Sequence, residues 1–191
     1  VLKDQVSEIL DKKKVIYPEE IETKGVAKAV QFIRKTKLDL SISLIKKLHK
    51  LCFKGSKSFA GNLRNVEVVI KDRFGSVIHQ GVPINDLDSA LQEYILWYKK
   101  NKDKFTPLVL AAIVHNQFEH IHPFQDGNGR VGRLLLNFIL IKNKYPPVNI
   151  FLEDRAEYYK TLQIYSRNNE LKSTLDFLLK QYKKMLKMYS K

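Results

Sequence analysis

The chain has 191 residues, 44% of them hydrophobic and 28% charged, which fits one globular domain. No signal peptide and no membrane-length apolar run is visible, so we expect a cytoplasmic protein without a membrane partner, in which the one cysteine, Cys52, is a reduced core residue. The formal net charge is +14, but the lysines are scattered and no zinc-finger or RNP-like pattern accompanies them, so nucleic-acid binding is not expected of this domain.

The N-terminal part of the chain is predicted to be helical. Residues 6–10 have helical spacing, and Pro18 suits the first turn of a second helix. Ser41 is a good N-cap for a third. We expect residues 1–36 to form an N-terminal helical segment with a candidate regulatory role, and residues 37–191 to form the main domain.

A short β-hairpin is predicted next. Residues 66–70 and 77–78 are β-prone runs separated by Gly75. In an otherwise helical chain such a hairpin has an exposed edge, which can pair with an extended segment of a partner. The alternative is that the hairpin serves packing alone. The candidate partner-binding residues are Val66, Glu67, Val68 and Val69.

The rest of the chain is predicted to form further helices. Thr106-Pro107 combines an N-cap with a proline at the first helical position. Helical patterns cover residues 87–97, 108–120, 154–165 and 175–188. The predicted fold class is therefore all-α, with one small hairpin.

One stretch, from His122 to Arg133, carries most of the polar chemistry. It runs into an almost wholly apolar segment, which predicts a buried helix from about Gly129 to Asn143. The start of a helix offers unpaired N–H groups and a partial positive charge, so anions bind there. Arg130 and Arg133 are three residues apart and share a helix face, and arginine pairs bidentately with phosphate oxygens.

Other residues of the stretch fit a phosphate site. Gly127 and Gly129 would let a ligand approach the main chain. Asp126 suits either Mg²⁺ beside phosphates or the cap of the helix. His122 can accept a proton near neutral pH. These residues indicate phosphoryl-type chemistry on a nucleoside triphosphate, in which positioning and charge stabilisation do most of the work.

The same stretch resembles the signature H-P-F-x-(D/E)-G-N-G-R-x-x-R of Fic domains, most of which transfer AMP from ATP to protein hydroxyls. The resemblance implies a helical bundle around a buried signature helix, with a hairpin flap over the active site that holds the target protein. It also implies that His122 takes the proton of a target Ser, Thr or Tyr hydroxyl and that Asp126 holds Mg²⁺. Pyrophosphate would leave, clamped by Arg130 and Arg133.

The resemblance gives roles to four more residues. The backbone amides of Gly127, Asn128 and Gly129, together with Asn128 itself, would cradle the phosphates of ATP. Tyr159 matches a family position near the adenine. Many Fic domains are silenced by a glutamate that occupies the second signature arginine, here Arg133. No clean copy of that motif is present: Glu22 has proline where a hydroxyl is expected, at Pro18.

Several other functions stay open. A metal-dependent hydrolase could use His115, Glu119, His120 and His122, but it would not explain the arginines. Doc relatives, which transfer phosphate, carry lysine where this chain has Gly129. Removal of AMP by the same site, a basic module that binds a partner or nucleic acid through the hairpin, and homo-oligomer formation are also open.

Overall fold

The computed structural model describes residues 3–71 and 74–189, and in this part of the chain the fold is helical with one two-stranded sheet. The elements, in order, are α1 (Lys3–Asp11), α2 (Pro18–Lys35), α3 (Ile42–Phe53), β1 (Val69–Lys71), β2 (Val77–Gln80), α4 (Leu87–Asn101), α5 (Pro107–Ile121), α6 (Asn128–Lys142), α7 (Arg155–Asn168) and α8 (Lys172–Tyr189). Short 3₁₀ turns precede α4 and α7. Among the described helices, none has the length and apolarity that crossing a membrane requires.

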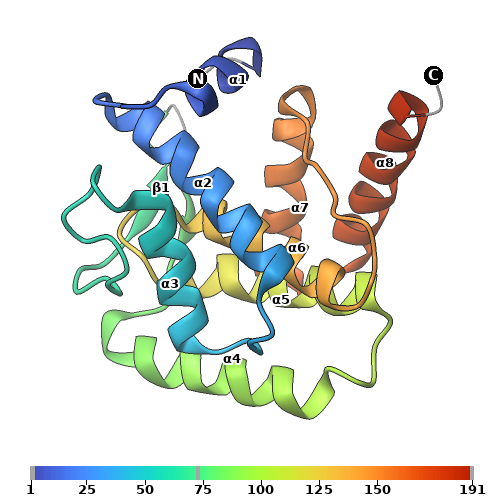
Figure 1. Ribbon diagram of the computed structural model, residues 1–191. Helices are drawn as coiled ribbons and strands as arrows, with labels where there is room; N and C mark the ends of the chain where they lie inside the picture. Colours follow the sequence, from blue (N-terminus) through green and yellow to red (C-terminus); the bar gives the residue numbers. More distant parts are fainter. Residues whose placement is uncertain (1–2, 72–73, 190–191) are drawn as a thin grey trace.

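Helices α5 and α6 form the centre of the molecule. In Figure 1 they lie between α2 and α3 on one side and α7 and α8 on the other, with α4 running below them. Helix α6 is apolar on nearly all faces, and its buried side chains include Val131, Leu135, Phe138 and Leu140. A helix without a polar face is stable only when neighbours cover it all round, which is the position that α6 occupies.

The predicted helices are confirmed, with shifts of a few residues at their ends. The signature helix was expected from Gly129 to Asn143 and runs from Asn128 to Lys142. The hydroxyl of Ser41 caps α3 by accepting a hydrogen bond from the backbone N–H of Leu44 at 3.2 Å. The first helical residue of α2 is Pro18, as its position in the sequence suggested.

The hairpin forms, but its first strand is shorter than predicted. The run 66–70 was expected to be a strand, whereas β1 begins at Val69 and pairs antiparallel with β2. The reason lies in the preceding residues, whose polar groups are engaged elsewhere: the carbonyl of Val66 accepts from the guanidinium of Arg64, and the carboxylate of Glu67 accepts from the N–H of Ile84. Most of the proposed flap residues therefore lie on the segment that leads into the strand.

Candidate active site

The residues of the signature stretch form a tight loop between α5 and α6. His122 ends α5 in the left-handed conformation (φ 54°), and Gly127 starts α6 with φ 89°. A side chain at position 127 would overlap the ring of Phe53, so only glycine fits there. The loop thus reverses the chain sharply, and the first N–H groups of α6 are left without partners inside the helix.

The side chain of Asn128 fixes this loop from inside. Its carbonyl oxygen accepts from the N–H of Phe124 at 2.9 Å, and its amide nitrogen donates to the carbonyl of Phe124 at 2.7 Å. Asn128 is 2% exposed. Because both ends of its amide are used, Asn128 can meet a ligand through its backbone N–H rather than through its side chain.

A buried histidine supports the loop from α3. The ring of His49 stacks on that of Phe124 at 3.9 Å between centroids, so Phe124 anchors the loop in the core and His49 has a structural role. Its Nδ1 accepts from the N–H of Gly61 at 2.8 Å, so Nε2 carries the proton and donates to the carbonyl of Asp126 at 3.0 Å.

His122 is held in the tautomer that a base requires. Its Nδ1 lies 3.2 Å from the carbonyl oxygen of Glu119, a contact that needs a proton on Nδ1 and leaves the lone pair on Nε2. Burial, with the nearby His79 and Arg64, lowers the pKa of His122 to about 4. The imidazole is therefore neutral at physiological pH and able to accept a proton.

Arg64 ties the hairpin to this loop. Its guanidinium is fully buried and donates to three carbonyls, those of His122 (2.8 Å), Val66 (3.0 Å) and Val82. The last two flank the hairpin, so a single side chain sets the distance between the hairpin and His122. His79, on β2 of the hairpin, lies with its ring 5.4 Å from that of His122.

The signature arginines line one cavity of about 310 Å³, which agrees with the shared helix face that their spacing predicted. Arg130 and Arg133 line it from α6, and Arg155, from the first turn of α7, lines it as well. Arg130 also pairs with Glu22 of α2. Sequence reasoning missed Arg155 and considered Glu22 only as a partner of Arg133, whereas the structure pairs Glu22 with Arg130. Both contacts depend on how distant helices pack.

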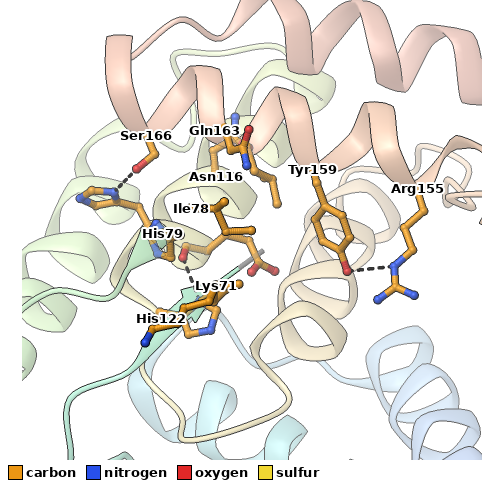
Figure 2. A pocket seen from close by; sticks show the side chains of 13 residues that line it. Lys71, Ile78, His79, Asn116, His122, Arg155, Tyr159, Gln163 and Ser166 are labelled. Carbon is orange, nitrogen blue, oxygen red and sulfur yellow. Dashed lines mark hydrogen bonds between the residues drawn. The ribbon is translucent and has the colours of Figure 1, made fainter. Parts of the chain in front are cut away.

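A second cavity, of about 320 Å³, opens beside His122. Figure 2 shows that the hairpin contributes Ile78 and His79 and that α7 contributes Tyr159 and Gln163. Its exposed lining is mainly apolar, which suits the faces of a flat ring system. Tyr159, which was expected beside a base, lines both this cavity and the arginine-lined one.

Asp126 does not cap the signature helix. The N-cap residue is Gly127, without a side-chain hydrogen bond, and the carboxylate of Asp126 stays about half exposed, 3.3 Å from the ammonium of Lys57. Of the two roles that the sequence left open, the cap is thus excluded by the structure. A half-exposed carboxylate two residues before the start of a helix fits Mg²⁺, which takes one or two carboxylates together with substrate phosphates.

A buried polar cluster beneath the signature helix was not anticipated. The carboxyl of Glu119 is packed against Gly132, where any larger residue would collide with it. Burial raises its pKa to about 7, against the opposing charge of Arg133. Next to it, Nε2 of His115 and the hydroxyl of Tyr158 lie 3.0 Å apart, and burial lowers the pKa of His115 to about 4.

The hydrolase alternative finds no support in this arrangement. Among residues 3–71 and 74–189, no three His, Cys, Asp or Glu side chains converge in a way that could hold a metal ion. His120 points to α7, where its Nδ1 lies 3.2 Å from the hydroxyl of Ser166.

Comparison with known proteins agrees with the geometry. Residues 39–140 match the Fic/DOC family. The chain is 31% identical over 147 residues to a protein adenylyltransferase Fic of Nematostella vectensis and 30% identical over 173 residues to that of Drosophila melanogaster. These alignments cover 74% and 88% of this chain but only 33% and 34% of the relatives.

A solved structure of a Fic-1 fragment from Caenorhabditis elegans superimposes with a TM-score of 0.85 at 27% identity, covering 99% of this chain and 57% of that one. The fold is thus that of Fic domains, with a buried signature helix and a hairpin beside the site. The chain belongs to the Fic/DOC family.

Proposed function

We propose that the chain is a protein adenylyltransferase, which transfers AMP from ATP to a hydroxyl of a target protein. The observation that carries this proposal is the junction of two cavities at Tyr159: one is apolar and borders His122, and the other is lined by arginines at the start of α6. A nucleoside triphosphate has this same division into a flat base and an anionic tail. The relatives named above support the choice of adenine and of protein as acceptor.

The reaction would use the residues as follows. The target hydroxyl oxygen attacks the α-phosphorus, a new O–P bond forms, and the bond to pyrophosphate breaks. Nε2 of His122 takes the hydroxyl proton, because its Nδ1 is already protonated toward Glu119. The N–H groups at the start of α6 and the two signature arginines stabilise the charge on the phosphates.

Asp126 would hold a Mg²⁺ ion, which supplies additional positive charge across the phosphates. For this its carboxylate has to leave Lys57, an exchange that an exposed ion pair allows at little cost, since such pairs contribute little to stability. The amides of Gly127, Asn128 and Gly129 lie on the same turn and would face the phosphates.

The target would dock on the hairpin. Three of the proposed residues, Val66, Glu67 and Val69, are exposed. A two-stranded sheet has two free edges, and an extended target segment that pairs with one of them would be aligned alongside His122. The hydrogen bonds of Arg64 support this, because they hold the hairpin and the loop together.

Residues 1–36 would regulate the site through Glu22. While Glu22 pairs with Arg130, it takes a position that an incoming phosphate needs. Replacing it, as in Glu22→Gln, should tighten ATP binding severalfold, whereas Glu19→Gln on the same helix should not. Equal ATP affinity in both variants and the wild type would exclude this regulatory role.

The proposed activity is tested with ATP labelled at the α- or the γ-phosphate, incubated with Mg²⁺ and cell lysate. We expect label from the α-phosphate only, and loss of about 10² to 10⁴ in rate for His122→Ala. Label from the γ-phosphate would instead indicate phosphate transfer of the Doc type, and unchanged labelling by His122→Ala would exclude this histidine as the base.

A further inference from the structure

Arg155 is the third arginine of the phosphate cavity, and nothing in the signature accounts for it. It lies in the first turn of α7 and lines the cavity that also contains Arg130 and Arg133. Together with Tyr159 it also borders the apolar cavity next to His122. Arg155 thus lies on the wall that separates the place for the base from the place for the phosphates.

The guanidinium of Arg155 contacts an uncharged partner on the same helix. Its Nε donates to the hydroxyl of Tyr159 at 3.0 Å, and its central carbon lies 5.3 Å from the centre of the same ring, as Figure 2 shows for the two side chains. This arrangement uses one of the five N–H groups and leaves the outer fork for another ligand.

The acidic residues around Arg155 are engaged by other cations. Asp154 pairs with Lys184 and Glu157 with Lys180, both from α8. Glu153 is 3.6 Å from Lys184. The lysines of α8 therefore neutralise the carboxylates that flank Arg155, while the charge of Arg155 stays directed at the cavity.

Arg155 and Arg130 also differ in what they face before a ligand arrives. Arg130 is paired with the carboxylate of Glu22, so a phosphate must displace an anion to reach it. The phenol beside Arg155 carries no charge and would keep its hydrogen bond when a phosphate binds. Arg155 is thus ready for an anion in the conformation described.

We propose that Arg155 is a phosphate-binding residue of the nucleotide site, which contacts the phosphate chain while Tyr159 positions its guanidinium. This proposal rests on the proposed function, because it needs a nucleotide that spans both cavities. It deepens that function by adding a third cation to the two of the signature and by giving Tyr159 a role toward the phosphates as well as toward the base.

The test compares ligands with and without phosphates. Binding of ATP, ADP and adenosine is measured by calorimetry for the wild type, Arg155→Gln and a matched control, Arg167→Gln, which changes an exposed arginine at the other end of α7. For Arg155→Gln we expect ATP and ADP to bind at least about tenfold more weakly, the usual effect of losing a charged hydrogen bond, and adenosine to bind as before. The control should change none of the three.

Two further variants distinguish the contact of Arg155 with phosphate from the positioning of its guanidinium by Tyr159. Arg155→Lys keeps the charge but loses the planar fork, and should recover part of the ATP affinity. Tyr159→Phe removes the hydrogen bond and keeps the ring, and should weaken ATP more than adenosine. For Arg155→Gln the affinity lost for ATP should shrink as salt is raised, because screening weakens the contact in the wild type.

Three outcomes would overturn the proposal. Equal weakening of adenosine and ATP would mean that Arg155 only shapes the base cavity, and unchanged ATP binding would mean that it makes no contact. If the wild type binds no nucleotide, the proposed function fails together with it. If the wild type binds ATP with the expected dependence on Arg155 but transfers no AMP, the function alone fails.

Discussion

The loop between α5 and α6 and the β-hairpin lie on two sides of the same cavity, but they are held very differently. In the loop, the buried residues Phe124 and Asn128 are each fixed by two or more contacts, to each other and to His49. In the hairpin, two short strands expose Val69 and Val77, and their register is irregular after Ile70. Arg64 is the buried link between the two regions.

This difference matches the two tasks of the proposed enzyme. The atoms that bind phosphate and remove a proton must be fixed before the substrate arrives, since reorganisation during the reaction is costly. A surface that accepts a protein segment gains from unpaired backbone groups. The comparison leads to four predictions, from the largest expected effect to the smallest.

Glycines with positive φ in the two regions should tolerate alanine very differently. In Gly127→Ala the new methyl group would meet the buried ring of Phe53, so both strain and overlap oppose folding, and we expect a loss of more than about 3 kcal/mol. In Gly75→Ala, at the hairpin, nothing lies within 4 Å and only the backbone strain of about 1 kcal/mol remains. Denaturant unfolding of both variants measures the contrast, and equal losses would contradict it.

Glu119→Gln should change how stability depends on pH. The pKa of Glu119 is raised from 4.5 to about 7 on folding, so the folded chain binds this proton more tightly than the unfolded chain. Its contribution to the free energy of unfolding is therefore present below pH 4.5 and is lost as pH rises to about 7. The variant should gain stability relative to the wild type with rising pH, by up to roughly 3 kcal/mol.

The comparison with the wild type is needed because His115 and His122 titrate in the opposite sense. Their pKa values are lowered to about 4, so their contribution to stability is lost as pH falls. Subtracting the free energy of unfolding of the wild type from that of Glu119→Gln at each pH cancels the contribution of the two histidines. A difference that stays constant between pH 5 and 8 would show that Glu119 is not the buried acid described.

On the acid side of its pH profile, kcat/KM for AMP transfer should fall only at low pH. Because burial keeps His122 neutral down to about pH 4, kcat/KM for AMP transfer should stay nearly constant between pH 7 and 5. Circular dichroism over the same range controls for unfolding. A fall in kcat/KM centred near pH 6.5, the pKa of an unperturbed histidine, would mean that the loop does not shield His122 in solution.

The smallest effect on stability is expected at the edge of the hairpin. The carbonyl of Val68 accepts from Gly81 and so faces β2, which means that the N–H of Val69 points to the free edge. Val69→Pro removes this donor and should lower the labelling of lysate proteins severalfold while ATP affinity is unchanged. Val69→Ala keeps the donor and is the matched control. Equal labelling by the two variants would exclude pairing at this edge.

The sequence predicted what depends on local pattern and missed what depends on packing. The apolar run after Arg130 predicted α6 to within one residue, and Ser41 caps α3 as expected. By contrast, Glu22 meets Arg130 across 108 positions of the chain. Arg155 reaches the arginine-lined cavity because α7 packs against α5, which itself packs against α6. The periodic pattern of hydrophobic residues does not predict such contacts between distant helices.

Two local expectations were also changed by tertiary contacts. Asp126 was a reasonable cap for α6, but the left-handed turn at Gly127 takes the cap position and leaves the carboxylate outside. The strand expected from Val66 starts at Val69, because Arg64 binds the carbonyl of Val66. In both cases contacts with a buried residue outweighed the structure that the local sequence favours.

A crystal structure of the chain with a non-hydrolysable ATP analogue would test the account most directly. We predict that the base occupies the apolar cavity between the hairpin and α7, that the phosphates lie at the start of α6 between Arg130, Arg133 and Arg155, and that the α-phosphorus faces Nε2 of His122. An analogue bound with its phosphates away from α6, or with its α-phosphorus out of reach of an acceptor hydroxyl beside His122, would contradict it.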